Sequence, residues 1–512
     1  MRQGFRQSMA WLHAWSGLVV GWVLFAVFVT GTASYYRAEI SQWMRPELVA
    51  APSDPARSAD LAAAYLQTAM PDAMGWYVEL PRPEKPAIGV TWWKSLEGPF
   101  HQALLDPATG NPTTARETRG GDFLYRFHFE LGMPPLWGRW IVGSCALVML
   151  VALVSGIVTH RRIFSDFFTF RRRRSQRGWL DAHNVFGVLA LPFHLMITYT
   201  GLVTLAPMYM PWGVVTAYKG DAMRFYVDSG LMPDLRGPAG KPGTLAPLSG
   251  MVAQAIAERG EAPEGISVYG PADAAASVVA VFEEAHGLAH EHPQIAFDGT
   301  TGAILGRSGA TRAATKTSTV MLGLHEGHFA GAALRGLFFL CGVMGAATVA
   351  TGLVLWAVAR APKAADAAGF GLRLVRMLNV GTIVGLPAGI AAYFLANRLL
   401  PLDLAARGDR EVGIFYLAWG LAAVLGALRP VETVWREGLA LVGLLFLAVP
   451  VVDAVATGLQ PLDGGMRFLG FDAAMVALGL LFGLAARKAG QAEHDRLRRA
   501  DAGLTGGEAL RA

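Results

Sequence analysis

Eight long apolar runs restrict what this sequence can fold into more than any other feature does. They cover residues 15–35, 137–159, 181–205, 336–359, 374–396, 412–428, 437–456 and 469–486. Each run has about 17 to 25 residues, which is enough for a helix to cross a hydrocarbon layer of roughly 30 Å. With 53% hydrophobic and only 16% charged residues, a chain of 512 residues has too few charges for an ordinary soluble protein. The pattern predicts an all-α polytopic membrane bundle of about eight spans.

Basic residues predict the orientation of these spans. The segment "HRRIFSDFFTFRRRRSQR" between the second and third runs is the most basic stretch of the chain, and short basic flanks beside the first, fourth and fifth runs agree with it. Lys and Arg in short loops favour the cytoplasmic side, so we expect both termini to be cytoplasmic and the first helix to remain uncleaved. The net charge of +5 is concentrated in these loops and indicates topology, with no nucleic-acid partner.

Two long polar segments then lie on the outer side, and each ends in a hairpin pattern. "HQALLDPATGNPTT" (101–114) and "HPQIAFDGTTGAILG" (292–306) both place a turn sequence between two short strand-like runs. The segments are therefore expected to form two α+β domains. The predicted organisation comprises spans 1–36, 127–160, 179–205 and 321–360, outer domains 37–126 and 206–320, a basic cytoplasmic loop 161–178, a four-helix membrane extension 361–487 and a cytoplasmic tail 488–512.

An internal duplication relates the first four spans. His13, Gly17 and Thr30-Gly31 recur with identical offsets as His183, Gly187 and Thr200-Gly201. The second and fourth spans also correspond when Arg139 is placed on Arg335, because Cys145 then meets Cys341 and Gly156 meets Gly352. The pattern predicts two copies of a unit made of helix, outer domain and helix. The last four spans contain no histidine, and the sequence assigns them no chemistry.

Seven of the twelve histidines lie in or beside the first four spans, in two tiers. The predicted cytoplasmic tier is His13, His160 and His183, and the predicted outer tier is His128, His194, His325 and His328. On a straight helix, His183 and His194 would be about 16 Å apart and within about 20° of the same direction. Imidazoles facing one interior at two depths would suit two haems, each held between two histidines for electron transfer. Equal depth predicts the pairs His13 with His183 and His128 with His325.

Other interpretations of these residues stay open. Histidines within membrane helices also act as interhelical hydrogen-bond donors or as parts of proton paths. Arg139 and Arg335 would either hold haem propionates or extend to the membrane interface. The tract "HGLAHEH" (286–292) could bind a metal or could simply be exposed. Cys145 and Cys341 both fall in apolar runs, so neither a disulfide framework nor a four-thiolate metal site is expected.

These motifs resemble the PepSY-associated transmembrane helix family. The resemblance covers about residues 5 to 360 and rests on "WLHAWSGLVVGWVLF", "RFHFELG", "WLDAHNVFGVLALPFHLMITYTG", "LHEGHFAG" and two outer D-x-x-T-G segments. It implies a bacterial inner-membrane protein with a four-helix haem-binding core and PepSY-like periplasmic domains. Family histidines would correspond to His13, His128, His183 and His325. His160, His194 and His328 would match a histidine-richer subgroup.

The resemblance also implies an activity, which is reduction of a ferric siderophore or another ferric chelate by electrons that cross the membrane through two b haems. No G-x-G-x-x-G segment opening a βαβ unit is evident, so quinol or a separate cytoplasmic donor would have to supply the electrons. The four additional spans leave two alternatives open. The chain could transport siderophore, iron or haem, or it could be a binding or signalling protein in which the histidines are structural.

Overall fold

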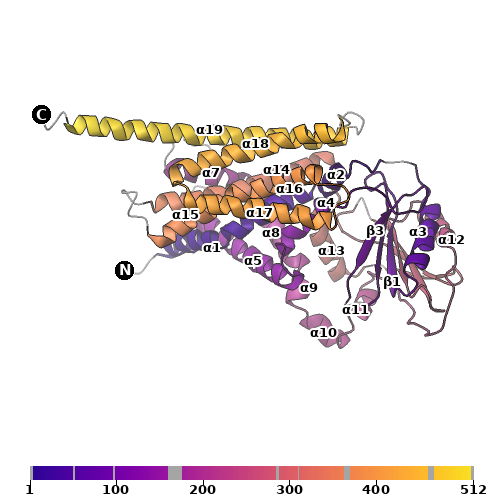
Figure 1. Ribbon diagram of the computed structural model, residues 1–512. Coiled ribbons are helices and arrows are strands. Elements are labelled where there is room, and N and C mark those ends of the chain that lie inside the picture. Colours follow the sequence, from indigo (N-terminus) through magenta and orange to yellow (C-terminus); the bar gives the residue numbers. More distant parts are fainter. Residues whose placement is uncertain are drawn as a thin grey trace. The chain divides into compact units, whose positions relative to one another are not determined.

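The computed structural model describes residues 4–49, 52–95, 98–159, 176–283, 287–309, 311–361, 369–458 and 466–508 (Figure 1). The chain separates into two compact units, which we call the membrane unit and the sheet unit. The membrane unit comprises residues 1–46, 116–202 and 332–512, and the sheet unit comprises residues 47–115 and 203–331. Most of the predicted basic loop, together with His160, lies outside the described residues.

Long apolar helices build the membrane unit, because lipid offers no water to satisfy backbone polar groups and a helix satisfies them internally. In the described ranges, seven spans are long and apolar enough to cross a membrane, and a bent helix pair supplies an eighth. They are α1 (Phe5–Ser34), α5 (Pro135–Thr159), the pair α7 (Gln176–Leu189) and α8 (Leu191–Thr204), α14 (Ala332–Ala359), α15 (Phe370–Ile383) with α16 (Gly385–Leu399), α17 (Arg407–Leu428), α18 (Val431–Thr457) and α19 (Met466–Glu508). The chain is a multi-pass membrane protein, as predicted.

Two details of the spans differ from expectation. The third span bends by 67° between α7 and α8. Pro192, the second residue of α8, explains the break because proline has no N–H and its ring clashes with the carbonyl one turn earlier. The straight-helix geometry assumed for His183 and His194 is therefore wrong. Helix α19 also continues to Glu508, well past the expected end at residue 487, and its Ala-, Arg- and Leu-rich end favours helix without an apolar environment.

Short helices α2 (Arg37–Trp43) and α4 (Gly120–Glu130) complete the membrane unit. The C-terminal extension contains buried ion pairs, and a hydrogen bond joins one of them to a preceding segment. Arg407 and Glu411 form an ion pair with both side chains fully buried. Thr118 donates a hydrogen bond to the Glu411 carboxylate. A second buried pair joins Arg398 to Asp453. The extension is thus attached to the rest of the membrane unit through buried polar contacts as well as through the packing of its apolar helices.

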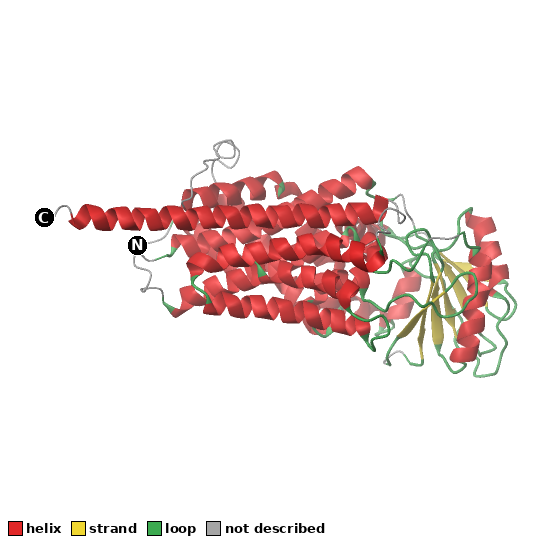
Figure 2. Cartoon of the chain, turned by 45° about the horizontal axis from the view of Figure 1, so that its top comes forward, coloured by secondary structure: helices red, strands yellow, loops and turns green. Residues whose placement is uncertain are grey.

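One antiparallel sheet organises the other unit (Figure 2). Its strand order is β3-β2-β1-β4-β5-β6-β7. The strands are β1 (Gly75–Glu79), β2 (Ile88–Trp93), β3 (His101–Leu105), β4 (Gly265–Tyr269), β5 (Ser277–Val281), β6 (Gln294–Asp298) and β7 (Ile304–Arg307). Helices α3 (Pro55–Ala69) and α12 (Leu248–Arg259) pack together beside it, and the remaining helices are α9 (Ala206–Tyr209), α10 (Trp212–Tyr218), α11 (Ala222–Asp228) and α13 (Ala313–Glu326).

The two outer segments do not form the two separate domains that we expected. The first contributes α3 and β1–β3, the second contributes α12 and β4–β7, and the centre of the sheet is the pairing of β1 with β4 around Tyr77 and Ser267. Separate sheets would each expose one of these strands as an unpaired edge, and pairing them removes both edges. Trp76, Val78 and Val268 are consequently buried in one shared core. The hairpin predicted over 292–306 is confirmed as β6 and β7.

Candidate functional site

Two predicted histidines meet inside the membrane unit. His13 lies in the first half of α1, His183 lies in α7, and their ring centres are 6.0 Å apart. Nδ1 of His13 is 2.8 Å from the carbonyl oxygen of Ala152 in α5. Nδ1 of His183 is 2.8 Å from the carbonyl oxygen of Thr348 in α14. Each ring is therefore oriented by a backbone carbonyl of a neighbouring helix.

The same contact recurs at a third histidine, His128 in α4, whose Nδ1 is 2.8 Å from the carbonyl oxygen of Val27. In all three cases a glycine follows the carbonyl residue by one helical turn and faces the imidazole. The three sets of histidine, carbonyl residue and glycine are His13–Ala152–Gly156, His183–Thr348–Gly352 and His128–Val27–Gly31. A side chain in the glycine's place would lean back over the preceding turn and cover the carbonyl. Glycine is what lets the ring approach.

These hydrogen bonds determine the chemistry of the rings. An imidazole that meets a carbonyl through Nδ1 carries its proton there, because a carbonyl oxygen only accepts. The lone pair is then on Nε2, so Nε2 is the nitrogen that can bind a metal. A backbone carbonyl bonded to the other ring nitrogen is the usual partner that orients a metal-binding histidine.

The distance between the first two rings also suits a shared metal ion. An imidazole nitrogen binds a metal at about 2 Å and lies a little over 1 Å from its ring centre, so two rings on opposite sides of one ion have centres about 6 Å apart. His13 and His183 match this separation at 6.0 Å. The residues present therefore fit a cofactor iron held between two imidazoles.

A second level of histidines lies further along α1. His128 contacts α1 at Val27, and the ring of His194 in α8 lies 5.7 Å from that of Phe28. Val27 follows His13 by fourteen residues, which is about 21 Å along a helix. His194 is 1% exposed, and its Nε2 has no hydrogen-bond partner among the described residues. Burying a polar nitrogen without a hydrogen bond costs free energy, and a ligand bound to that nitrogen would offset the cost.

The other predicted site residues have different surroundings. Arg139 pairs with Glu130 at 2.6 Å, and Arg335 pairs with Glu39 at 2.6 Å, so each guanidinium already holds a protein carboxylate. Their role with haem propionates stays a prediction. His325 and His328 belong to the sheet unit, whereas the histidines described above belong to the membrane unit.

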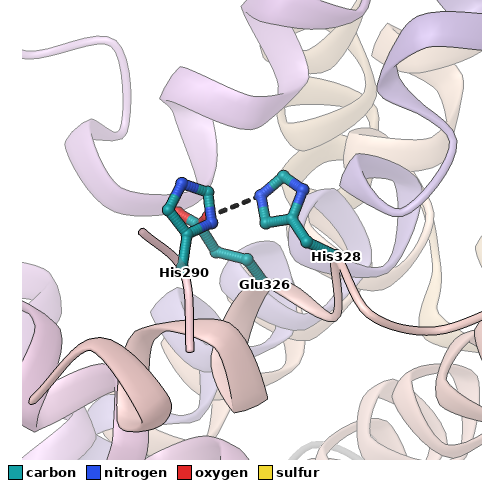
Figure 3. A group of neighbouring side chains, drawn as sticks. All are labelled: His290, Glu326 and His328. Atoms are coloured by element: carbon teal, nitrogen blue, oxygen red, sulfur yellow. Dashed lines mark hydrogen bonds and ion pairs between the residues drawn. The ribbon is translucent and has the colours of Figure 1, made fainter. Parts of the chain in front are cut away.

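A cluster in the sheet unit was only partly anticipated. His290, which belongs to the "HGLAHEH" tract, lies beside Glu326 and His328 (Figure 3). Glu326 was missed, although the spacing in "HEGH" (325–328) was a usable signal. Burial opposes ionisation of Glu326, but hydrogen bonds from His290 and His328 outweigh it and hold the pKa of this carboxyl well below its ordinary value. A hydrogen bond with Glu264 raises the pKa of His292 next to the cluster.

Comparison with known proteins identifies the family. The PepSY-associated TM region family matches residues 10–359, which include all the histidines of the membrane unit described above. The chain belongs to this family. It is also similar to the uncharacterized protein PA4219 of Pseudomonas aeruginosa, with 28% identity over 389 residues, or 70% of this chain and 92% of the relative. Residues beyond 359, including the helices from α15 to α19, lie outside the family match.

Proposed function

We propose that this PepSY-associated protein binds b-type haem and transfers electrons across a bacterial inner membrane to a ferric chelate in the periplasm. Ferric siderophore is the chelate class that the sequence resemblance favours, and quinol or a cytoplasmic protein would donate the electrons. Both termini would be cytoplasmic and the sheet unit periplasmic. The chain would then act as a ferric-chelate reductase.

One observation carries the haem assignment. Three histidines each contact a backbone carbonyl through Nδ1 and lie beside a glycine one turn further along the same helix. Structural histidines need no common tautomer, whereas histidines that hold a haem iron through Nε2 all carry their proton on Nδ1. His13 and His183 have the ring separation of a two-histidine site. His128 and His194 are candidates for the second level.

The proposed duplication receives support from the same contacts. Moving 196 positions along the chain carries Ala152 to Thr348 and Gly156 to Gly352, while moving 170 positions carries His13 to His183. These are the offsets that aligned the two halves in the sequence. The sheet unit has the same twofold repetition, because each outer segment contributes one helix that packs beside the sheet, followed by antiparallel strands. Two equivalent halves would supply equivalent ligands from both copies.

The residues described here would hold and orient the cofactor. A haem held by two such imidazoles would supply single-electron transfer. The carbonyls of Ala152 and Thr348 would fix the tautomers of His13 and His183. Iron(III) is bound tightly by hard oxygen donors, whereas iron(II) is held weakly, so one electron per iron releases the metal from its chelate.

An optical spectrum tests this proposal. Protein purified from cells supplied with haem should show a sharp α band after dithionite, and a pyridine haemochrome assay should give two haems per chain. His183→Ala should remove one of them, while His101→Gln, at an exposed histidine of β3, should keep both. A colourless wild-type protein would refute the proposal. Uptake of iron by proteoliposomes without any reductant would favour a transporter instead.

A further inference from the structure

The cluster around His290 is assembled by a loop fixed against α13. The backbone N–H of His290 donates to the carbonyl oxygen of Thr319 at 2.9 Å. A Cβ at Gly323 would lie 2.0 Å from the carbonyl oxygen of Leu288, so only glycine allows the loop to pass this close. Gly327 then ends α13 with φ +73°, a left-handed conformation that glycine adopts without strain. The chain turns there, and His328 faces back toward Glu326.

Three donor atoms converge as a result. Nδ1 of His290 lies 3.0 Å from Oε2 of Glu326, and Nε2 of His328 lies 2.7 Å from the same oxygen. The ligand atoms of all three residues are within 4.8 Å of one another, and Figure 3 shows the side chains pointing toward a common point. Metal–nitrogen and metal–oxygen bonds of about 2.0–2.2 Å place neighbouring donors about 3 Å apart. The cluster is already close to that spacing.

The outward nitrogens of both rings have orienting partners. Nε2 of His290 lies 2.6 Å from Nε2 of His292, and Nδ1 of His292 lies 2.8 Å from the carboxylate of Glu264. Nδ1 of His328 is 3.7 Å from the carboxylate of Glu283. Chains of imidazole and carboxylate behind the ligands orient metal-binding histidines and raise their basicity. A set of exposed side chains without a ligand would have no need of this second layer.

We propose that His290, Glu326 and His328 bind a divalent first-row transition-metal ion. Two imidazoles and one carboxylate suit zinc, ferrous iron and similar ions, while calcium and magnesium prefer oxygen donors alone. Three protein ligands leave coordination positions for water or an exchangeable ligand. His328 is 41% exposed, which gives an ion a route from solvent. The site is independent of the proposed electron transfer, although ferrous iron is the product that this reaction would release.

Equilibrium dialysis of the purified full-length protein measures the site directly. After removal of adventitious metal with a chelator, the protein is dialysed separately against micromolar Zn²⁺, Co²⁺, anaerobic Fe²⁺ and Mg²⁺, and bound metal is counted by mass spectrometry. Wild-type protein should bind one more equivalent of Zn²⁺, Co²⁺ or Fe²⁺ than either His290→Ala or Glu326→Gln. Haem iron is counted separately from the haemochrome spectrum.

Two controls keep the result decisive. His101→Gln changes a histidine of the same unit outside the cluster and should bind as much metal as wild type. Unchanged circular dichroism and haem content in His290→Ala and Glu326→Gln would show that the loss is local. The inference is overturned if wild type and both variants bind equal amounts of each transition metal, or if Mg²⁺ alone is bound. Equal binding would mean that the two imidazoles and the Glu326 carboxylate only bond to one another.

Discussion

Replacing Gly31 with alanine should remove one haem while leaving the protein folded. A Cβ at this position would lie 2.6 Å from both Cε1 and Nδ1 of His128, whereas ordinary contacts between such atoms are about 3.5–4.0 Å. The ring must therefore move by about 1 Å, which is half the length of a metal–imidazole bond of about 2 Å. Its hydrogen bond to Val27 would be lost in the same movement, so His128 could no longer ligate.

The effect on folding should be smaller. Overpacking typically costs about 1–3 kcal/mol, and alanine in a helix recovers about 0.8–1.0 kcal/mol relative to glycine, so the free energy of unfolding should fall by no more than about 2 kcal/mol. A matched control is Gly17→Ala in the same helix, where a Cβ has nothing within 4 Å. It should retain full haem content.

The haemochrome ratio and the reduced α band decide the outcome. Gly31→Ala should fall from two haems to one, and its remaining spectrum should match that of the His128→Ala variant. If Gly31→Ala keeps both haems with an unshifted spectrum, His128 is not an iron ligand and the seating of its ring is structural only. A similar loss in Gly17→Ala would show that α1 is simply intolerant of substitution.

Three further predictions concern other parts of the chain. His183→Ala should abolish the haem at the His13 level, and added imidazole should restore its α band if the missing ligand is the cause; a variant that never loses colour contradicts the assignment. Glu411→Gln should lower the free energy of unfolding of the membrane unit by about 3–5 kcal/mol, measured by thermal unfolding in detergent, because it leaves the Arg407 guanidinium buried without its carboxylate. The control Asp409→Asn breaks an exposed ion pair and should cost about 0–1 kcal/mol. For Asp298, burial opposes ionisation, but hydrogen bonds from Thr300 outweigh it and lower its pKa to about 2. This stabilisation is complete above the unfolded-state pKa of about 3.9 and is lost as the pH falls through about 2, so Asp298→Asn should lower the melting temperature at pH 7 and not at pH 2.

The sequence was sufficient for features that repeat or that have a fixed length. Apolar runs predicted the spans because the thickness of a bilayer sets how many residues cross it. The offset between His13 and His183 predicted that they meet, because equivalent positions in two equivalent helices reach the same depth. The hairpin over 292–306 followed from turn residues between two short strands.

Features that depend on distant partners were not predictable. Nothing local in β1 or β4 indicates that the two strands pair with each other, since an edge strand and a central strand share the same apolar pattern. The bend at Pro192 overrode an angle calculated for a straight helix. Glu411 and Arg407 precede the apolar run 412–428, and the hydrogen bonds that satisfy the buried Glu411 carboxylate come from Thr118 and Asn397 in other segments.

The pairing of β1 with β4 has a consequence for biosynthesis. β1 ends at Glu79 and β4 begins at Gly265, so the ribosome must add 185 residues between the two strands. At about 5–20 residues per second, the first half of the sheet waits about 10 to 40 s for its partner. During that interval two further spans, α5 and the α7–α8 pair, must be inserted, and the second polar segment begins to be made. A nascent chain arrested before residue 265 lacks the partner of β1 and should therefore recruit chaperones or be degraded.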